Sequence, residues 1–216
     1  EAEKDAEIIV GFNSPVDADI YQQHLSNKKL LDILNKEKAS PGDVFFLPAG
    51  RIHAIGAGVL LAEIQQTSDA TLRIFDFDRV DDKGKPRELH TEKALEAIDF
   101  NPVEQFKTSY DKKPDHSNVL ARCKYFTTNY IDLTRPLERD YNWIDSFVIY
   151  MCLQGSFNIF YRSGEMEPVK KGDTVLLPAD LKYVKLLPEG SSKLLEVFIE
   201  GNKKADLTDD LIDRLL

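Results

Sequence analysis

The chain has 216 residues, of which 42% are hydrophobic, so it is long enough to bury the core of one large domain or of two small ones. Its net charge of −9 and isoelectric point near 5.0 argue against nucleic acids and anionic membranes as partners, because both would repel it. No apolar run approaches the ~20 residues that cross a bilayer, and the opening EAEKDAEIIVGF lacks the pattern of a signal peptide. Cys123 and Cys152 lack zinc-site spacing and indicate reduced thiols of a cytoplasmic protein, with a disulfide as the alternative.

The first part of the chain predicts one strand and then a helical segment. The run Ala6–Phe12 is mostly apolar and has the pattern of a strand, with no turn, cap or partner before it. From Val16 to Lys38 the apolar residues recur at helical intervals, which predicts two short helices separated at Ser26–Asn27. Asp17 or Asp19 is the expected N-cap of the first helix.

Two short apolar runs follow, Val44–Leu47 and Val59–Ala62. Their β-branched and aromatic residues predict strands buried on both faces, with turns at the Pro and Gly residues between them. His53 would then begin a strand and face the interior of a β-barrel, with Glu63 on the neighbouring run.

His53, Glu63 and Arg73 are the polar groups of this region that chemistry can use. Imidazole at the mouth of a barrel is a good zinc ligand. A carboxylate on the next strand suits a second ligand or a proton-transfer group, and Arg73 suits an oxyanion opposite the metal. The spacing also leaves structural roles open: a hydrogen-bonded His53, and an ion pair between Glu63 and Arg73.

A charged loop comes next. Asp81–Pro86 has the composition of a turn, and Thr91 is the expected cap of a short helix that ends at Ile98. The acidic residues lack the spacing of a calcium loop, so solvated acids and ion pairs with Arg79 and Arg87 are favoured over a cation site: Asp76, Asp78, Asp81 and Asp82. The polar range 101–118, which contains Pro, is the expected linker.

A ten-residue pattern of the first half recurs later in the chain. Lys171–Asp180 (KGDTVLLPAD) matches Pro41–Gly50 (PGDVFFLPAG), with Asp173 130 positions after Asp43. This repeat predicts two cupin barrels, which are double-sheet jelly rolls. The same offset places Tyr183 at the position of His53, and Trp143–Val148 has no His-x-His pair, so the second barrel is expected to bind no metal. The predicted fold is therefore mainly β: two cupin-type jelly-roll barrels with a short helical insertion.

The second half is rich in predicted strands. Apolar runs alternate with Gly-containing turns at hairpin spacing: Phe126–Leu133, Ser146–Leu153, Ser156–Tyr161, Thr174–Leu177, Tyr183–Leu187 and Leu194–Ile199. The aromatic residues Trp143, Phe157, Phe160 and Tyr161 are expected in the core or between the barrels rather than on a sugar platform. The tail 205–216 carries a helical stripe that would dock on a barrel or fray.

Type I phosphomannose isomerases, in their short bacterial form, have a central part that resembles two stretches of this chain, DAEIIVGFN and GDVFFLPAGRIHAIGAGVLLAEIQQTSDATLRIFDFDRVDDKGKPRELHTEKALEAIDF. The spacing of HA, an acid ten residues later, SD, and then Arg73 is specific to that family. The resemblance implies interconversion of aldose and ketose phosphates with one zinc ion bound by two His, one Glu and one Gln.

The resemblance also implies roles for individual residues. His53 would be the last protein ligand of the zinc and Arg73 the active-site arginine, while Glu63 and Asp69 would line the pocket. Arg79 stands where larger relatives place a Lys, which makes it a candidate substrate-binding residue, and Ala70 stands where they have Asn. These two departures bear on the phosphate contacts and the pocket shape.

In that family the first strand follows a segment that supplies the other three zinc ligands, and the 216 residues do not include such a segment. We therefore expect the C-terminal two thirds of an enzyme, in which only His53 of the four ligands is present. The expected domains are a first, catalytic barrel at 1–100, incomplete at its N-terminus and with a helical insertion at about 17–38, and a metal-free barrel at 119–204. Exposed sheet edges would lower stability or favour pairing with another chain, as in a homo-oligomer.

The function implied is a zinc-dependent isomerase that interconverts mannose 6-phosphate and fructose 6-phosphate through an enediol. Arg73 would support the developing oxyanion, and Glu63 is a candidate base, so the partner is a small sugar phosphate. A catalytically inactive, sugar-binding or regulatory cupin is the alternative, because three ligands are not in the sequence. An iron-dependent cupin oxygenase would need its own set of facial ligands.

Overall fold

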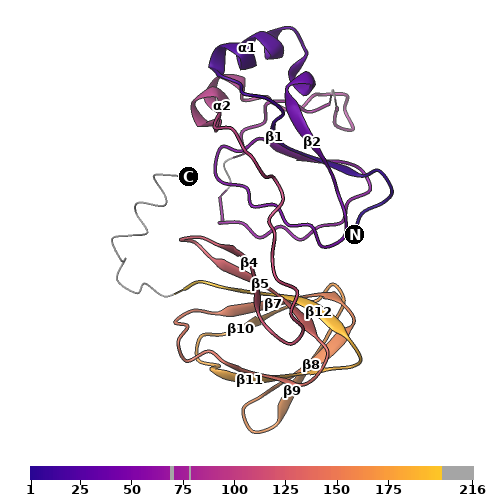
Figure 1. Cartoon of the computed structure of the whole chain (residues 1–216), viewed down its shortest axis with the longest axis vertical. Coiled ribbons are helices and arrows are strands. Elements are labelled where there is room, and N and C mark those ends of the chain that lie inside the picture. Colours follow the sequence, from indigo (N-terminus) through magenta and orange to yellow (C-terminus); the bar gives the residue numbers. More distant parts are fainter. Residues whose placement is uncertain (69–70, 78, 201–216) are drawn as a thin grey trace. The chain divides into compact units, whose positions relative to one another are not determined.

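A computed structural model describes residues 1–68, 71–77 and 79–200 of the chain. It divides into two compact units, Glu1–Thr108 and a second unit that begins at Ser109 (Figure 1). The boundary falls inside the range expected to be the linker, and the predicted mainly-β class is confirmed. The predicted tail, 205–216, lies outside the described residues.

The first unit is built on a three-stranded antiparallel sheet. Its central strand is β1 (Glu7–Phe12), which pairs with β2 (Leu34–Lys38) on one side and with β3 (His53–Ile55) on the other. The strand predicted at the start of the chain is thus confirmed. Gly11 has a φ of +65° at the irregularity between Ile9 and Phe12, where the register with β2 shifts.

The predicted helical insertion is correct only in its first part. Helix α1 (Ala18–Ser26) begins after Asp17, whose carboxylate accepts the Ile20 N–H at 2.8 Å as an N-cap. A short 3₁₀ turn, η1 (Leu30–Asp32), follows. The prediction of helix to Lys38 was wrong, because the following residues alternate between the core and solvent and pair with β1 as strand β2.

Helix α2 (Thr91–Ala97) packs its buried Ala94 against this unit, and the N-cap of the helix is His90. Thr91, the predicted cap, lies instead in the first turn. The core of the unit gathers residues from α1, η1, β2 and the preceding loops: Val16, Tyr21, Leu30, Ile33 and Leu34. Phe100 contacts it from the end of the α2 segment, stacking on Phe12 and edge-on to Tyr21.

The two copies of the repeat fold into the same turn. The Asp43 carboxylate accepts the Ser40 N–H at 2.9 Å, and the Asp173 carboxylate accepts the Lys170 N–H at 3.0 Å. Thr174–Leu177 then forms strand β10, whereas Val44–Leu47 forms no strand. The prediction for the first copy was wrong because β10 has a neighbouring strand to pair with and Val44–Leu47 has none in the described chain.

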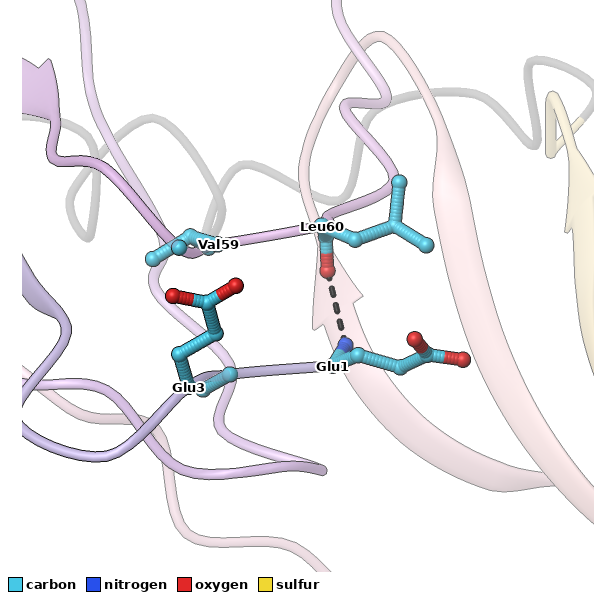
Figure 2. Close-up of a pocket in the computed structure, with 6 residues that line it drawn as sticks. Glu1, Glu3, Val59 and Leu60 are labelled. Atoms are coloured by element: carbon cyan, nitrogen blue, oxygen red, sulfur yellow. Dashed lines mark hydrogen bonds between the residues drawn. The ribbon is translucent and has the colours of Figure 1, made fainter.

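The predicted strand Val59–Ala62 is also not formed. Val59 makes a single bridge to Ala2, and Leu60 is 61% exposed. The amino nitrogen of Glu1 donates to the Leu60 carbonyl at 2.8 Å, and Figure 2 shows the two segments side by side. They line a small hollow of about 330 Å³. One bridged residue does not make a ladder, so this apolar run stays exposed.

The second unit consists of two antiparallel sheets, in the orders β10-β7-β12-β5-β4 and β6-β11-β8-β9. Its strands are β4 (Asn118–Arg122), β5 (Thr127–Leu133), β6 (Leu137–Asp140), β7 (Val148–Gln154), β8 (Ser156–Tyr161), β9 (Glu165–Lys170), β10 (Thr174–Leu177), β11 (Tyr183–Pro188) and β12 (Ser192–Phe198). Both sheets contribute to one apolar core, which includes Ile131, Tyr150, Phe157, Leu186 and Leu194. This is the packing of a two-sheet jelly roll, and the strands predicted from the apolar runs are confirmed.

Trp143 does not lie in the core, which was one of its two predicted places. Its side chain is 57% exposed, its indole N–H donates to the Asp140 carbonyl at 3.1 Å, and its ring lies edge-on to Phe198. The cysteines Cys123 and Cys152 are both free. Within the described residues, no helix is long and apolar enough to span a membrane.

Candidate active site

His53 opens strand β3, where it pairs with Val10 of β1. Its Nδ1 lies 3.0 Å from the Arg51 carbonyl oxygen. A carbonyl only accepts, so in the neutral ring Nδ1 carries the proton and Nε2 has the lone pair. The side chain is exposed, so Nε2 is presented to solvent as a donor atom, in the tautomer that zinc-ligating histidines adopt.

Arg51 and Asp99 fix the backbone just before His53. The Arg51 guanidinium donates to the Asp99 carboxylate at 2.6 Å, and the two side chains are only 11% and 15% exposed. The Asp99 N–H also donates to the Gly50 carbonyl at 3.0 Å. Burial acts to raise the pKa of Asp99, but hydrogen bonds from Asn101 and Arg51 outweigh it and lower that pKa below 3.8. The carbonyl that orients His53 is therefore held by a largely buried ion pair.

Gly50→Ala is expected to disrupt this support. Gly50 has a φ of +85°, and a methyl group there would lie 2.2 Å from the Ala97 carbonyl oxygen. Gly84, at φ +75°, has nothing within 4 Å, so Gly84→Ala tests the backbone strain alone. We expect Gly84→Ala to cost about 1 kcal/mol in unfolding free energy and Gly50→Ala about 1–3 kcal/mol more from the clash. If denaturant titrations gave the same loss of unfolding free energy for both variants, the structure would accommodate the methyl group at Gly50 at no extra cost.

Arg73 is half-buried and is held by the segment just before α2. Its backbone N–H donates to His90 Nδ1 at 3.1 Å, and its carbonyl accepts the His90 N–H at 2.7 Å. Its Nη1 donates to the Glu88 carbonyl at 3.3 Å. In the described part of the chain, its Nε and Nη2 have no hydrogen-bond partner, so these donors are available to an anionic oxygen.

Arg79 is engaged in a separate ion-pair cluster. Its Nη2 donates to the buried carboxylate of Asp76 at 2.6 Å, and Arg87 Nε donates to the other oxygen of that carboxylate at 2.7 Å. The hydrogen bond from Arg87, together with Arg79, lowers the pKa of Asp76 from 3.8 to about 2. The pairing predicted for Arg79 and Arg87 is confirmed, and it gives Arg79 a structural partner.

Two predicted site residues remain, Glu63 and Asp69. Glu63 is exposed and on no strand, contrary to its predicted place on a strand next to His53. Asp69 lies outside the described residues. Between any two of His53, Glu63 and Arg73, the described chain shows neither a hydrogen bond nor an ion pair. The described residues therefore do not form the predicted Glu63–Arg73 pair.

Among the predicted site residues, His53 has a donor atom that fits zinc. His53 offers an exposed Nε2 with the other ring nitrogen hydrogen-bonded to a carbonyl, which is the usual arrangement of a histidine ligand. Residues 1–68, 71–77 and 79–200 contain no group of three His, Cys, Asp or Glu side chains that would hold a metal ion. A structural zinc site needs four ligands and a catalytic one three. The described residues thus bring together no complete set of zinc ligands.

Sequence reasoning missed three supporting residues, Arg51, Asp99 and His90. Arg51 and Asp99 are 48 positions apart, and no local pattern pairs them. His90 had a weak signal: it stands just before a helix, in the stretch RELH, which the resemblance covers. Turns and helix ends bring such residues to a site without leaving a periodic pattern in the sequence.

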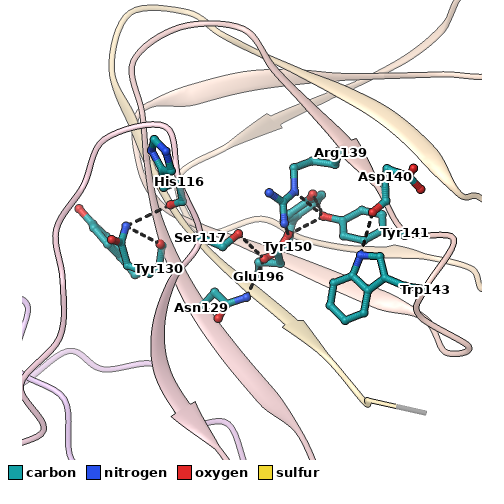
Figure 3. A network of polar contacts seen from close by, with 11 residues as sticks. His116, Ser117, Asn129, Tyr130, Arg139, Asp140, Tyr141, Trp143, Tyr150 and Glu196 are labelled. Atoms are coloured by element: carbon teal, nitrogen blue, oxygen red, sulfur yellow. Dashed lines mark hydrogen bonds and ion pairs between the residues drawn. The ribbon is translucent and has the colours of Figure 1, made fainter. Parts of the chain in front are cut away.

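The second unit holds a buried polar cluster that sequence reasoning also missed. Glu196 of β12 is fully buried, and its carboxylate accepts hydrogen bonds from Arg139 at 2.7 Å and Tyr141 at 2.6 Å (Figure 3). Its other oxygen accepts from Ser117 and Asn129, each at 2.8 Å. Every carboxylate oxygen is satisfied, so the cluster is a structural network of the barrel interior.

Comparison with known proteins relates the chain to one enzyme family. No family model matches the chain. Mannose-6-phosphate isomerase ManA of Bacillus subtilis is 34% identical over 189 residues, covering 86% of this chain and 58% of its own length. The crystal structure of the mannose 6-phosphate isomerase from Bacillus subtilis superposes with a TM-score of 0.81 and 30% identity, over 92% of this chain and 62% of that chain.

A more distant solved structure shares the fold. A point mutant of phosphomannose isomerase from Salmonella typhimurium is 15% identical, with a TM-score of 0.69 over 93% of this chain and 67% of that chain. The chain therefore spans about three fifths of the relatives that it matches at 30% identity or more. By sequence and by fold, the chain is similar over most of its length to part of the mannose-6-phosphate isomerases.

Proposed function

We propose that this chain forms part of a zinc-dependent isomerase that interconverts mannose 6-phosphate and fructose 6-phosphate. The 34% identity to ManA, spread over 189 residues, is the observation that carries the proposal. The orientation of His53 supports it, because a neighbouring carbonyl fixes the ring and, in the neutral tautomer, leaves the lone pair on Nε2. Because the chain spans 58% of ManA, we propose that the other zinc ligands come from outside these 216 residues.

The proposed reaction moves a proton between adjacent carbons through an enediol. Zinc, when bound, would supply Lewis-acid polarisation of the substrate oxygens, and His53 Nε2 would be one of its ligands. Arg73 would place the N–H groups of its Nε and Nη2 against the developing negative charge. Glu63 is the proposed base, because it is an exposed carboxylate without a partner in the described chain. Asp69 and Arg79 are proposed to contact the sugar phosphate.

The proposal extends to the partner and the compartment. A sugar phosphate is the proposed substrate, on the strength of the relatives' names. Two free cysteines agree with a reducing cytoplasm, which we propose as the location. Exposed apolar side chains between Phe46 and Leu89 favour association of the first unit with further polypeptide, either a second copy or another part of the same protein.

A coupled isomerase assay on mannose 6-phosphate tests the proposal. It compares the 216-residue chain with a longer chain that adds the part of ManA outside the aligned region, with zinc measured in both. We expect activity and about one zinc per molecule in the longer chain only, because only it has a complete ligand set. Absence of both from the longer chain would favour the alternative, a sugar-binding or regulatory cupin.

A further inference from the structure

We infer that His90 is a positioning residue for Arg73, and that it acts through an unprotonated Nδ1. The inference rests on the proposed function, because it concerns the arginine proposed to support the oxyanion. His90 belongs to neither the predicted metal site nor the predicted substrate pocket. What distinguishes it is the direction of its hydrogen bond to the Arg73 backbone.

The four histidines of the chain fall into two kinds. In His24, His53 and His116, Nδ1 faces a backbone carbonyl, at 2.9, 3.0 and 2.8 Å, and must therefore donate. In His90, Nδ1 faces the Arg73 N–H at 3.1 Å and must therefore accept. The proton of the neutral ring is then on Nε2, which lies 4.0 Å from Glu88 Oε2.

The hydrogen bonds around Arg73 form a closed two-residue bridge. The Arg73 carbonyl accepts the His90 N–H at 2.7 Å, in addition to the bond that the His90 ring accepts. His90 is itself fixed, because its carbonyl accepts the Ala94 N–H at 2.8 Å and so starts helix α2. Ala94 is buried, so Arg73 is tied through His90 to a packed helix.

The same segment orients the guanidinium. The Glu88 carbonyl accepts Arg73 Nη1 at 3.3 Å, and Arg87 is anchored on the buried carboxylate of Asp76. Three contacts therefore hold the segment around Arg73. The Arg87 side chain is anchored on Asp76, the Glu88 carbonyl accepts from the Arg73 guanidinium, and His90 bonds to the Arg73 backbone. Loss of the His90 acceptor would leave the half-buried Arg73 N–H without a partner, and the chain would shift to hydrate it. A shift of about 1 Å in a catalytic group can cost 100-fold in rate.

Two amide substitutions separate the acceptor role of His90 from its volume. In His90→Asn the amide group stands where Nδ1 stood and can accept from the Arg73 N–H. In His90→Gln the amide group stands where Nε2 stood and leaves that N–H unpaired. His24→Gln, in α1 of the same unit, is the matched control. We expect kcat of the longer isomerase chain to fall about 10- to 100-fold in His90→Gln, with KM changed less than about 3-fold because the oxyanion contact acts in the transition state.

His90→Asn and His24→Gln should stay within about 3-fold of the parent kcat, on the same argument. In the 216-residue chain, the ¹⁵N shifts of the His90 ring should show protonated Nε2 and bare Nδ1. The Arg73 amide should exchange with solvent faster in His90→Gln than in His90→Asn. These last two measurements need no activity, so they decide the contact even where the proposed function fails.

Three results would overturn the inference. Finding the His90 ring protonated at Nδ1 would show that it cannot accept the hydrogen bond from the Arg73 N–H. Equal losses of kcat in His90→Asn and His90→Gln would mean that the ring only fills space. Unchanged kcat and Arg73 exchange in His90→Gln would mean that Arg73 is held without it. An inactive parent with the expected ring tautomer would overturn the proposed function and leave the contact between His90 and Arg73 standing.

Discussion

Glu196→Ala is expected to lower the unfolding free energy of the second unit by about 3–5 kcal/mol. Glu196 is fully buried in β12 and is the only acidic group that Arg139 contacts in the described chain. Its removal leaves the Arg139 charge, which is 19% exposed, without a counter-ion, and it takes away the acceptor of three further groups: the Tyr141 hydroxyl, the Ser117 hydroxyl and the Asn129 amide. Breaking such a network lowers the unfolding free energy by more than the intact network adds to it, because the remaining polar groups stay buried without their partner.

The ionisation of the surrounding groups shows how closely they are coupled to Glu196. Burial and the charge of Glu196 both raise the pKa of the Tyr150 hydroxyl above its ordinary value of 10.0. Burial acts to lower the pKa of Arg139, but Glu196 outweighs it and the net direction is upward. Burial likewise raises the pKa of the Tyr141 hydroxyl, so both tyrosines stay neutral, and Arg139 stays charged, at ordinary pH.

The matched control is Glu138→Ala. Glu138 lies one residue from Arg139 on the same strand, but its ion pair with Lys185, at 3.6 Å, is exposed. We expect the control to change stability by less than about 1 kcal/mol. Chemical denaturation followed by the fluorescence of Trp143, the single tryptophan, reports on this unit. Equal effects of Glu196→Ala and Glu138→Ala would contradict the structural role of the network.

His53→Ala is expected to abolish zinc binding and isomerase activity in the longer chain that carries the remaining ligands. Under the proposed function the substitution removes one of four ligands, and zinc affinity depends on the complete set. We expect at least a 100-fold loss of zinc affinity, since changes even in the groups that orient metal ligands cost about 10–100-fold. Competition with a chromogenic chelator measures the affinity, and the coupled assay measures the activity.

His116→Ala is the control for this prediction. His116 also donates from Nδ1 to a carbonyl two residues earlier, at Pro114, and is also exposed. It differs from His53 in lying in the second unit, before β4. If His116→Ala retains zinc and His53→Ala loses it, His53 is a ligand because of its position in the fold. The hydrogen bond that both histidines make would not by itself create a ligand. Zinc retained in both variants would remove His53 from the proposed site.

The repeat shows most clearly what local sequence determines. Asp43 and Asp173 make the same turn because a carboxylate three residues after a backbone N–H closes it without help from the rest of the chain. Asp17 caps α1 for the same local reason. Strands such as β7, β8 and β11 were predictable because their burial alternates with period 2 and one face is buried. The candidate ligand His53 was found through the motif around it.

Tertiary structure decided the features that depend on a distant partner. Thr174–Leu177 is a strand and Val44–Leu47 is not, although their sequences match, because a strand needs a neighbour to pair with. The residues 34–38 became a strand for the complementary reason, since β1 was there to pair with them. The supports of the candidate site, Arg51 with Asp99 and Arg73 with His90, likewise join positions 48 and 17 residues apart. A sequence pattern reports what each residue prefers, whereas these contacts exist only once the fold has brought both partners together.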